Sequence, residues 1–117
     1  MIKEFIYQNQ KYIISIGKNK TENWGIIDGA SSDDLWFHLN DFPSPHVILK
    51  TNNLTIDEIP NEVIKECCLL CKQYSKYKNM PNDYLKIIYT PVYNIKKGED
   101  IGSVVYKSMK KLLFQKI

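Results

Sequence analysis

Two histidines, an aspartate and a tryptophan are the residues of this chain whose types and spacing come closest to a reactive site. Asp34, Trp36 and His38 alternate within one largely apolar run, and His46 follows eight residues after His38. No other histidine occurs in the protein. A histidine held by a carboxylate is the usual arrangement for general acid-base catalysis, and such side chains also ligate metals. The geometry that the sequence predicts decides whether acid-base catalysis or metal binding is feasible here.

Strand geometry argues against catalysis by this group. Side chains alternate between the two faces of a strand, so residues 34–39 predict an apolar core face and a second face that carries Asp34, Trp36 and His38. Asp34 and His38 would then be about 13 Å apart along the strand, which is too far for a hydrogen bond. No serine lies in a G-x-S-x-G motif. We therefore expect no catalytic residue and no enzyme.

Three cysteines are a second candidate for metal chemistry. Cys67, Cys68 and Cys71 share a helical pattern, but a structural zinc site needs four ligands and there is no fourth cysteine. A histidine would complete the set only if the sheet brought it under the helix. Thiols buried on an apolar stripe are the simpler interpretation. We expect no metal and no cofactor.

Short β-rich runs predict the elements that hold the histidines. Residues 2–7 and 12–17 predict a β-hairpin. The polar and basic residues 17–24 predict a loop or a single helical turn. Residues 34–39 and 46–50 predict two further strands that run antiparallel to each other. The two histidines would therefore lie where this second pair of strands is connected.

The register of the second pair decides whether the histidines meet. Pro43 and Pro45 keep the connection extended, because each proline disfavours helical geometry in the preceding residue. If Leu39 pairs with His46, the two histidines lie on opposite faces of the sheet. A slip of one residue puts His38 and His46 on the same face. The sequence leaves both registers open.

The principal helix is predicted over about residues 60–78. Apolar residues recur there at spacings of three and four, Pro60 stands in the first turn, and glutamates come early and lysines late. Further strands are predicted at residues 85–90, 103–106 and 112–114. Strands, then one helix, then strands predict an α+β fold, in which the helix packs on one face of a mainly antiparallel sheet.

Size and composition predict one globular domain. The 117 residues suffice for a single core, so we expect residues 1–117 to form one domain. No run approaches the length of a membrane span, and the N-terminus has no signal-peptide layout. An odd number of clustered cysteines fits a reducing compartment. We therefore expect no membrane span and a cytoplasmic location.

Charge is unevenly distributed along the chain. Residues 24–66 carry two lysines against eight acids, whereas residues 67–117 carry ten lysines against three acids. This asymmetry predicts a basic face, as expected of a nucleic-acid-binding protein. All sixteen basic residues are lysine. Lysine is a point charge that suits phosphates better than base edges, so binding without sequence specificity is favoured.

Several short motifs are spaced as in one known domain. They extend over about residues 11–107 and include the run from Asp34 to His38. The motifs are Gly17-Lys18-Asn19, Asn23, Asp34-Leu35-Trp36-Phe37-His38, His46-Val47, Ser75-Lys76, Tyr89-Thr90-Pro91, Lys96-Lys97 and Gly102-x-Val104. Together they resemble the NFACT-R domain, also known as DUF814, which occurs in ribosome quality control factors. The chain is most similar to the short eukaryotic proteins in which this domain stands almost alone.

The resemblance implies a non-enzymatic nucleic-acid-binding module. RNA is the expected partner, either tRNA or rRNA, in translation or ribosome quality control. Ligand-facing roles would fall to Lys18, Asn23, Asp34, Trp36, His38, His46, Ser75, Lys96 and Lys97. Lys20 and Lys76 join the other lysines as expected phosphate contacts. Trp36 and His38 would either contact a nucleotide or brace the turn that ends at His46.

Two departures from the family pattern affect what the resemblance implies. The usual Pro-Gly-Ser-His turn is Pro43-Ser44-Pro45-His46 in this chain, which is stiffer. The N-terminal domain and coiled coil of the large factors have no counterpart here, so peptide tailing on the ribosome is not expected. The alternative to RNA binding is a module that binds or senses DNA, or an adaptor that contacts a ribosome or another protein.

Overall fold

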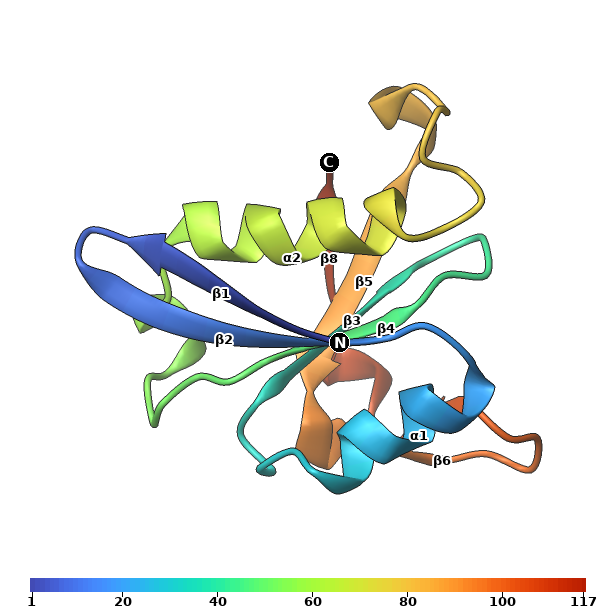
Figure 1. The fold of residues 1–117 in the computed structure, drawn as a ribbon. Coiled ribbons are helices and arrows are strands. Elements are labelled where there is room, and N and C mark those ends of the chain that lie inside the picture. The colour runs from blue at the N-terminus through green and yellow to red at the C-terminus, as the bar shows by residue number, and fades with distance from the viewer.

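A six-stranded antiparallel sheet forms the centre of the protein (Figure 1). The computed structural model describes residues 1–117, and the strand order is β1-β2-β4-β3-β5-β8. Two helices and a two-stranded ribbon cover the sheet, so the α+β prediction is confirmed. The six strands are β1 (Ile2–Tyr7), β2 (Gln10–Gly17), β3 (Leu35–Leu39), β4 (His46–Leu49), β5 (Lys86–Pro91) and β8 (Leu113–Lys116).

The N-terminal strands form the predicted hairpin. β1 pairs with β2 from Ile2 opposite Ser15 to Tyr7 opposite Gln10. Gln8 and Asn9 close the turn with positive φ angles of 48° and 64°, the geometry that matches the twist of a two-residue hairpin.

β3 is a central strand, with β4 on one side and β5 on the other. Leu35, Phe37 and Leu39 belong to the main core of seventeen buried residues, and Trp36 belongs to a separate cluster. The predicted division of this strand into two faces is therefore confirmed. Because both faces are covered, β3 is buried along nearly its entire length.

Helix α2 (Asn61–Gln73) covers the first face of the sheet. Its buried stripe includes the three cysteines, as predicted. The helix ends five residues before the predicted Lys78. The Ser75 hydroxyl donates to the Lys72 carbonyl at 2.7 Å and accepts from the Tyr77 N–H at 3.0 Å, so a turn replaces the next helical hydrogen bonds. The Tyr77 ring then packs against Phe42.

Helix α1 (Lys20–Asp28) corrects the prediction of a loop or single turn over residues 17–24. Asn19 caps it, because the Asn19 Oδ1 accepts from the Glu22 N–H at 2.9 Å. The Glu22 carboxylate in turn accepts from the Lys18 N–H at 3.1 Å. This reciprocal arrangement resembles a capping box. Asn-x-x-Glu was the available signal, but the helix has only a weak apolar stripe to support it.

The second face of the sheet is covered by α1 and by the ribbon of β6 (Ile95–Lys97) and β7 (Val104–Tyr106). Trp36, Ile48, Ile88 and Ile95 are buried there. The sheet is thus the middle layer, with α2 on one side and α1 and the ribbon on the other (Figure 1). Neither helix has the length and apolar content needed to cross a bilayer.

Candidate nucleic-acid interface

The register of β3 and β4 brings the two histidines together. Trp36 pairs with Ile48 and Phe37 with Val47, so His38 stands opposite His46. This is the slipped register of the two that the sequence left open. The two imidazole centroids are 5.3 Å apart, and Trp36 lies 5.6 Å from His38 and 5.2 Å from His46. We call Trp36, His38 and His46 the aromatic triad.

The aromatic triad is uncharged near neutral pH. Trp36 is 1% exposed and His46 is 3% exposed, whereas His38 is partly exposed. Burial, with a smaller contribution from His38, lowers the pKa of His46 to about 3. Burial also lowers the pKa of His38, although its hydrogen bond to the Leu39 carbonyl opposes this. The histidines therefore add no positive charge for phosphates at neutral pH.

Asp34 is bound within the fold and makes no hydrogen bond to either histidine. It is 4% exposed. Its Oδ2 accepts from the Ser31 N–H at 2.9 Å and its Oδ1 from the Thr51 N–H at 3.1 Å. The carboxylate thus joins the turn before β3 to the segment after β4. This arrangement supports a structural role in place of the ligand-facing role that the family resemblance implies.

Asn23 fastens α1 to the sheet beside His46. Its side-chain Oδ1 accepts from the His46 N–H at 3.0 Å, and Gly17 pairs with His46 across β2 and β4. A Cβ atom on Gly17 would lie 2.3 Å from the Asn23 Oδ1 and 2.8 Å from its backbone N. The absence of a side chain at Gly17 therefore permits this close approach. Asn23 is buried and orients the start of α1.

The connection between the histidine strands is held by Ser44. Its hydroxyl accepts from the Leu39 N–H at 3.0 Å and donates to the Pro45 carbonyl at 3.0 Å. The stiff Pro43-Ser44-Pro45 sequence is therefore fixed by one hydrogen bond to the end of β3 and one within itself, and it places His46 directly opposite His38.

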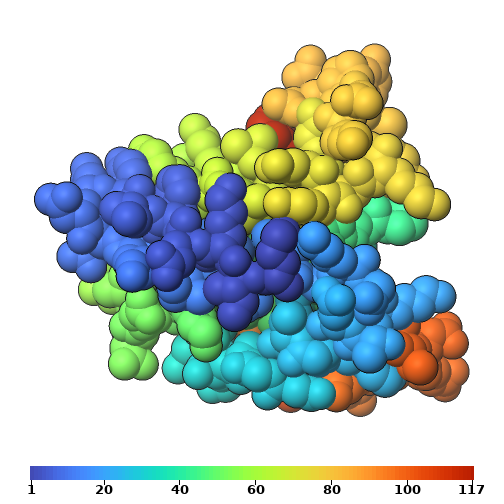
Figure 2. Space-filling model, viewed as in Figure 1, coloured from blue at the N-terminus to red at the C-terminus, as the bar shows by residue number.

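The start of α1 lies between the end of α2 and the ribbon. The Lys18 Nζ is 5.5 Å from the centre of the Tyr74 ring, at the end of α2. On the other side, a Cβ on Gly102 would come within 2.9 Å of the Lys20 Cα. Figure 2 shows the same order at the right of the molecule, with blue residues between yellow and orange ones. Segments distant in sequence thus share one edge.

Four of the predicted lysines are exposed on α1 and the ribbon or in the segments next to α1 and α2. They form no ion pair with a carboxylate, unlike three other lysines of the protein. Unpaired ammonium groups are available to phosphates. We call these four residues the lysine rim: Lys18, Lys20, Lys76 and Lys96.

Two predicted contacts differ from the lysine rim. Lys97 pairs with Asp28 at 2.6 Å and lies 5.3 Å from the centre of the Trp24 ring. Its charge is therefore balanced between α1 and the ribbon. Ser75 uses its hydroxyl to terminate α2 and is only partly exposed. Both residues support neighbouring structure.

Sequence reasoning missed two aromatic residues of this region. The Trp24 Nε1–H donates to the Ser103 carbonyl at 2.8 Å and so ties α1 to the ribbon. The Tyr106 ring packs on Trp36 with centroids 5.9 Å apart. Trp24 could have been predicted to belong to this region only if α1 had been recognised as a helix. Tyr106 has no local signal, because the contact spans seventy residues of sequence.

Two buried polar atoms of the aromatic triad have no hydrogen-bond partner. They are the Trp36 Nε1 and the His46 Nδ1. Orphaned buried polar atoms are uncommon, and each costs about 1–3 kcal/mol. No cluster of three or more His, Cys, Asp or Glu side chains is arranged to hold a metal. Burial raises the pKa of the Cys68 thiol to about 12, so the cysteines are inert core residues.

The chain has relatives among known proteins and spans about half the length of several of them. It is 34% identical over 117 residues to the Coiled-coil domain-containing protein 25 homolog of Dictyostelium discoideum, covering 97% of this chain and 56% of that protein. It is 30% identical over 98 residues to the Rqc2 homolog RqcH of Bacillus subtilis, covering 81% of this chain and 16% of that protein.

A solved structure shares the fold. The C-terminal part of the fibronectin/fibrinogen-binding protein from Streptococcus suis superposes with a TM-score of 0.81 at 24% identity, covering 99% of this chain and 45% of that one. The sequence also matches the NFACT protein RNA binding domain over residues 1–108. This match covers nearly the whole chain and includes the aromatic triad and the lysine rim. The chain belongs to the NFACT protein RNA-binding domain family.

Proposed function

We propose that this domain binds RNA without catalysis and that the lysine rim contacts the phosphates. The observation that carries the proposal is the set of four exposed lysines without carboxylate partners beside the start of α1, after the end of α2 and on the ribbon. Lys18 and Lys20 flank the capped start of α1, which is locked to the sheet through Asn23 and His46. A rigid support holds these ammonium groups in place before RNA arrives, which reduces the entropy cost of binding.

His38 is the member of the aromatic triad that is suited to touch the RNA. Its Nδ1 bonds to the Leu39 carbonyl, which can only accept a hydrogen bond, so the Nδ1 carries the proton. In the neutral ring the Nε2 is then an acceptor. An acceptor at a partly exposed position fits a ribose 2′-hydroxyl or a base N–H. Trp36 and His46 would brace His38 from behind.

The biological setting that we propose is ribosome quality control in the cytoplasm, with tRNA or rRNA as the ligand. Its support is the likeness to the Rqc2 homolog RqcH and the description of the family as RNA-binding. Contacts with the ribosome or with a protein partner belong to the same proposal. Because the chain covers a small part of RqcH, the activity of that whole protein is not transferred.

Duplex DNA is the second candidate ligand. The lysine rim contains no arginine, and ammonium groups attract the phosphates of DNA and RNA alike. His38 distinguishes the two, because only RNA offers a 2′-hydroxyl to its acceptor. A preference for tRNA over duplex DNA that declines on His38→Ala substitution would favour RNA. Tighter binding of duplex DNA than of tRNA would favour the second candidate.

Salt-dependent binding of tRNA tests the proposed interface. We expect Lys18→Ala with Lys20→Ala to weaken affinity and to make the negative slope of log K against log salt shallower by about 1.4, the value for two lost single-strand phosphate contacts. Lys65→Ala with Lys116→Ala removes the same charge from exposed sites off the rim and is the matched control. An equal loss in both pairs would contradict a localised interface, and no binding by the unaltered protein would overturn the proposal.

A further inference from the structure

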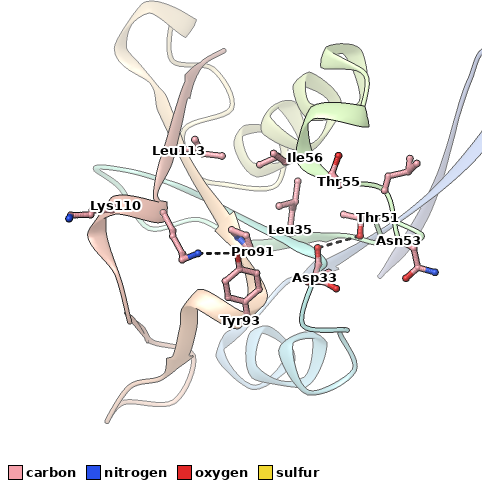
Figure 3. A pocket seen from close by; sticks show the side chains of 12 residues that line it. Asp33, Leu35, Thr51, Asn53, Thr55, Ile56, Pro91, Tyr93, Lys110 and Leu113 are labelled. Carbon is pink, nitrogen blue, oxygen red and sulfur yellow. Dashed lines mark hydrogen bonds between the residues drawn. The ribbon is translucent and has the colours of Figure 1, made fainter.

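A groove of about 600 Å³ opens at the end of β3 remote from the histidines (Figure 3). Leu35 lies in the groove and is three residues from His38, about 10 Å along an extended strand. The groove is large enough for a small organic ligand. No residue of the lysine rim or of the aromatic triad lines it. It is therefore a separate candidate site.

The floor of the groove is apolar because α2 does not reach this corner of the sheet. α2 packs against β1 to β4, and Leu35 pairs with Pro91 at the adjoining end of β5. Leu113 on β8 is left 37% exposed, and Ile56 in the turn before α2 is exposed as well. Five apolar side chains line the groove: Leu35, Leu54, Ile56, Pro91 and Leu113.

One wall of the groove supplies hydrogen-bond donors and positive charge. The Lys111 Nζ lies 3.4 Å from the Tyr93 hydroxyl and 5.1 Å from the centre of its ring. Neither Lys111 nor Lys110 pairs with a carboxylate. Lys110 stands on the same side, with its amine directed away from the groove (Figure 3). Lys111 and the Tyr93 hydroxyl could therefore bind one anionic group together.

The opposite wall supplies acceptors. Asp33, Thr51 and Asn53 lie there, on the far side of Tyr93 from Lys110, and Asp33 is the nearest of the three to Tyr93 (Figure 3). The Thr51 hydroxyl donates a hydrogen bond to the Asp33 carbonyl at 3.3 Å. The Asp33 carboxylate has no ion-pair partner, and the Asn53 amide makes no hydrogen bond within the protein. A carboxylate and an amide without partners in the protein are thus available at this wall.

We propose that this groove binds one 5′-nucleotide. The phosphate lies at Lys111 and Tyr93, the base lies over the apolar floor, and its N–H groups point to Asp33 and Asn53. Guanine fits best, because its N1–H and exocyclic amine are adjacent donors that one carboxylate can accept together. The nucleotide is either free or part of a single-stranded nucleic acid.

The two unlike walls favour a nucleotide over an acidic peptide. An acidic peptide would satisfy Lys111 but would bring further carboxylates toward Asp33, where like charges repel. A nucleotide carries its anionic group and its donor edge at different ends of the molecule, and the groove likewise has Lys111 on one side of Tyr93 and Asp33 and Asn53 on the other. None of the residues of the proposed RNA interface lines the groove, so nucleotide binding in the groove is independent of RNA binding at the lysine rim.

Titration of the full chain with GMP tests the proposal, by calorimetry and by amide chemical shifts. We expect shifts at Leu35, Tyr93, Lys111 and Leu113, and weaker responses to UMP, guanosine and ribose 5-phosphate. Lys111→Ala should weaken GMP binding about tenfold, because one charged hydrogen bond is lost. Asp33→Asn should bring the GMP and UMP affinities close together. Lys65→Ala is the matched control for a lost lysine and should change neither affinity.

Further titrations show whether the nucleotide is free or part of a strand, and which results would contradict the proposal. In the Lys18→Ala, Lys20→Ala background, tighter binding of a GGG RNA trimer than of GMP indicates a strand, and equal binding indicates a free nucleotide. Shifts at the groove with a hexaglutamate peptide and none with GMP would overturn the proposal in favour of a peptide. Absence of groove shifts at millimolar GMP would also overturn it, whatever the tRNA result.

Discussion

The imidazole of His38 stands 5.3 Å from that of His46, directly across the β3–β4 pair. Two histidines so close resemble an acid-base pair, but burial lowers the pKa of both, and Asp34 bonds elsewhere. The pair is better understood with Trp36, which lies against both rings. The three rings together form a neutral, rigid support for one partly exposed hydrogen-bond acceptor, the His38 Nε2.

Stability should fall as pH falls, because His46 is buried in its neutral form. In the unfolded chain its imidazole takes up a proton near pH 6.5, whereas in the folded protein it does so only near pH 3. The unfolded state binds more protons between these values, so this group adds a slope of at most about 1.4 kcal/mol per pH unit. Urea unfolding between pH 7 and pH 5 measures it.

His46→Gln is the control for this pH dependence. The variant should be less stable than the unaltered protein at pH 7, and its stability should change less between pH 7 and pH 5. His38 also has a lowered pKa, so part of the slope should remain. An unchanged slope in His46→Gln would show that His46 is accessible to protons in the folded state.

Gly17→Ala should destabilise the protein by about 1–3 kcal/mol, the range for overpacking. The new Cβ would collide with the Asn23 side chain and backbone, displacing α1 from His46. Gly25→Ala is a sharp control, because a Cβ there meets nothing within 4 Å and the position is inside α1. Gly25→Ala should raise stability by about 0.5–1 kcal/mol. Thermal unfolding compares the two, and equal effects would contradict the tight contact at Gly17.

Much of the fold could be predicted from the sequence because it rests on local pattern. Alternation predicts β3 and its two faces, and apolar spacing predicts α2. α1 was missed because its stripe is weak and its stability comes from Asn19 and Glu22 and from packing on the ribbon. The β3–β4 register was open because a one-residue slip gives an equally plausible loop.

The candidate site was harder to predict because its hydrogen bonds join distant segments. The His46 N–H bonds to Asn23 and the Thr51 N–H to Asp34, contacts that no local pattern predicts. Residue types therefore predicted a group of polar residues but not the division between those inside the fold and those on its surface. That division separates Asp34 and Asn23 from the lysine rim.

Lys96 and Lys97 should behave differently despite being neighbours. Lys96→Ala should weaken tRNA binding and reduce its salt dependence without affecting stability, because Lys96 is exposed and unpaired. Lys97→Ala breaks a partly exposed ion pair with Asp28, so it should cost up to about 1 kcal/mol of stability. Binding and urea unfolding on both variants test this. An identical loss of affinity in both would mean that RNA displaces Lys97 from Asp28.

Trp36 should remain inaccessible when RNA binds, if it braces His38 and does not stack on a base. Trp24→Phe leaves Trp36 as the single tryptophan, and its burial predicts weak quenching of its fluorescence by iodide. We expect that quenching to stay weak with tRNA bound and the emission to change little. His38→Ala in the same background should weaken binding, since the partly exposed acceptor is lost. A large emission change on adding tRNA, together with normal binding by His38→Ala, would instead show that the RNA opens the aromatic triad and contacts Trp36 itself. The Trp36 Nε1, which has no hydrogen-bond partner in the protein, would then gain one from the RNA.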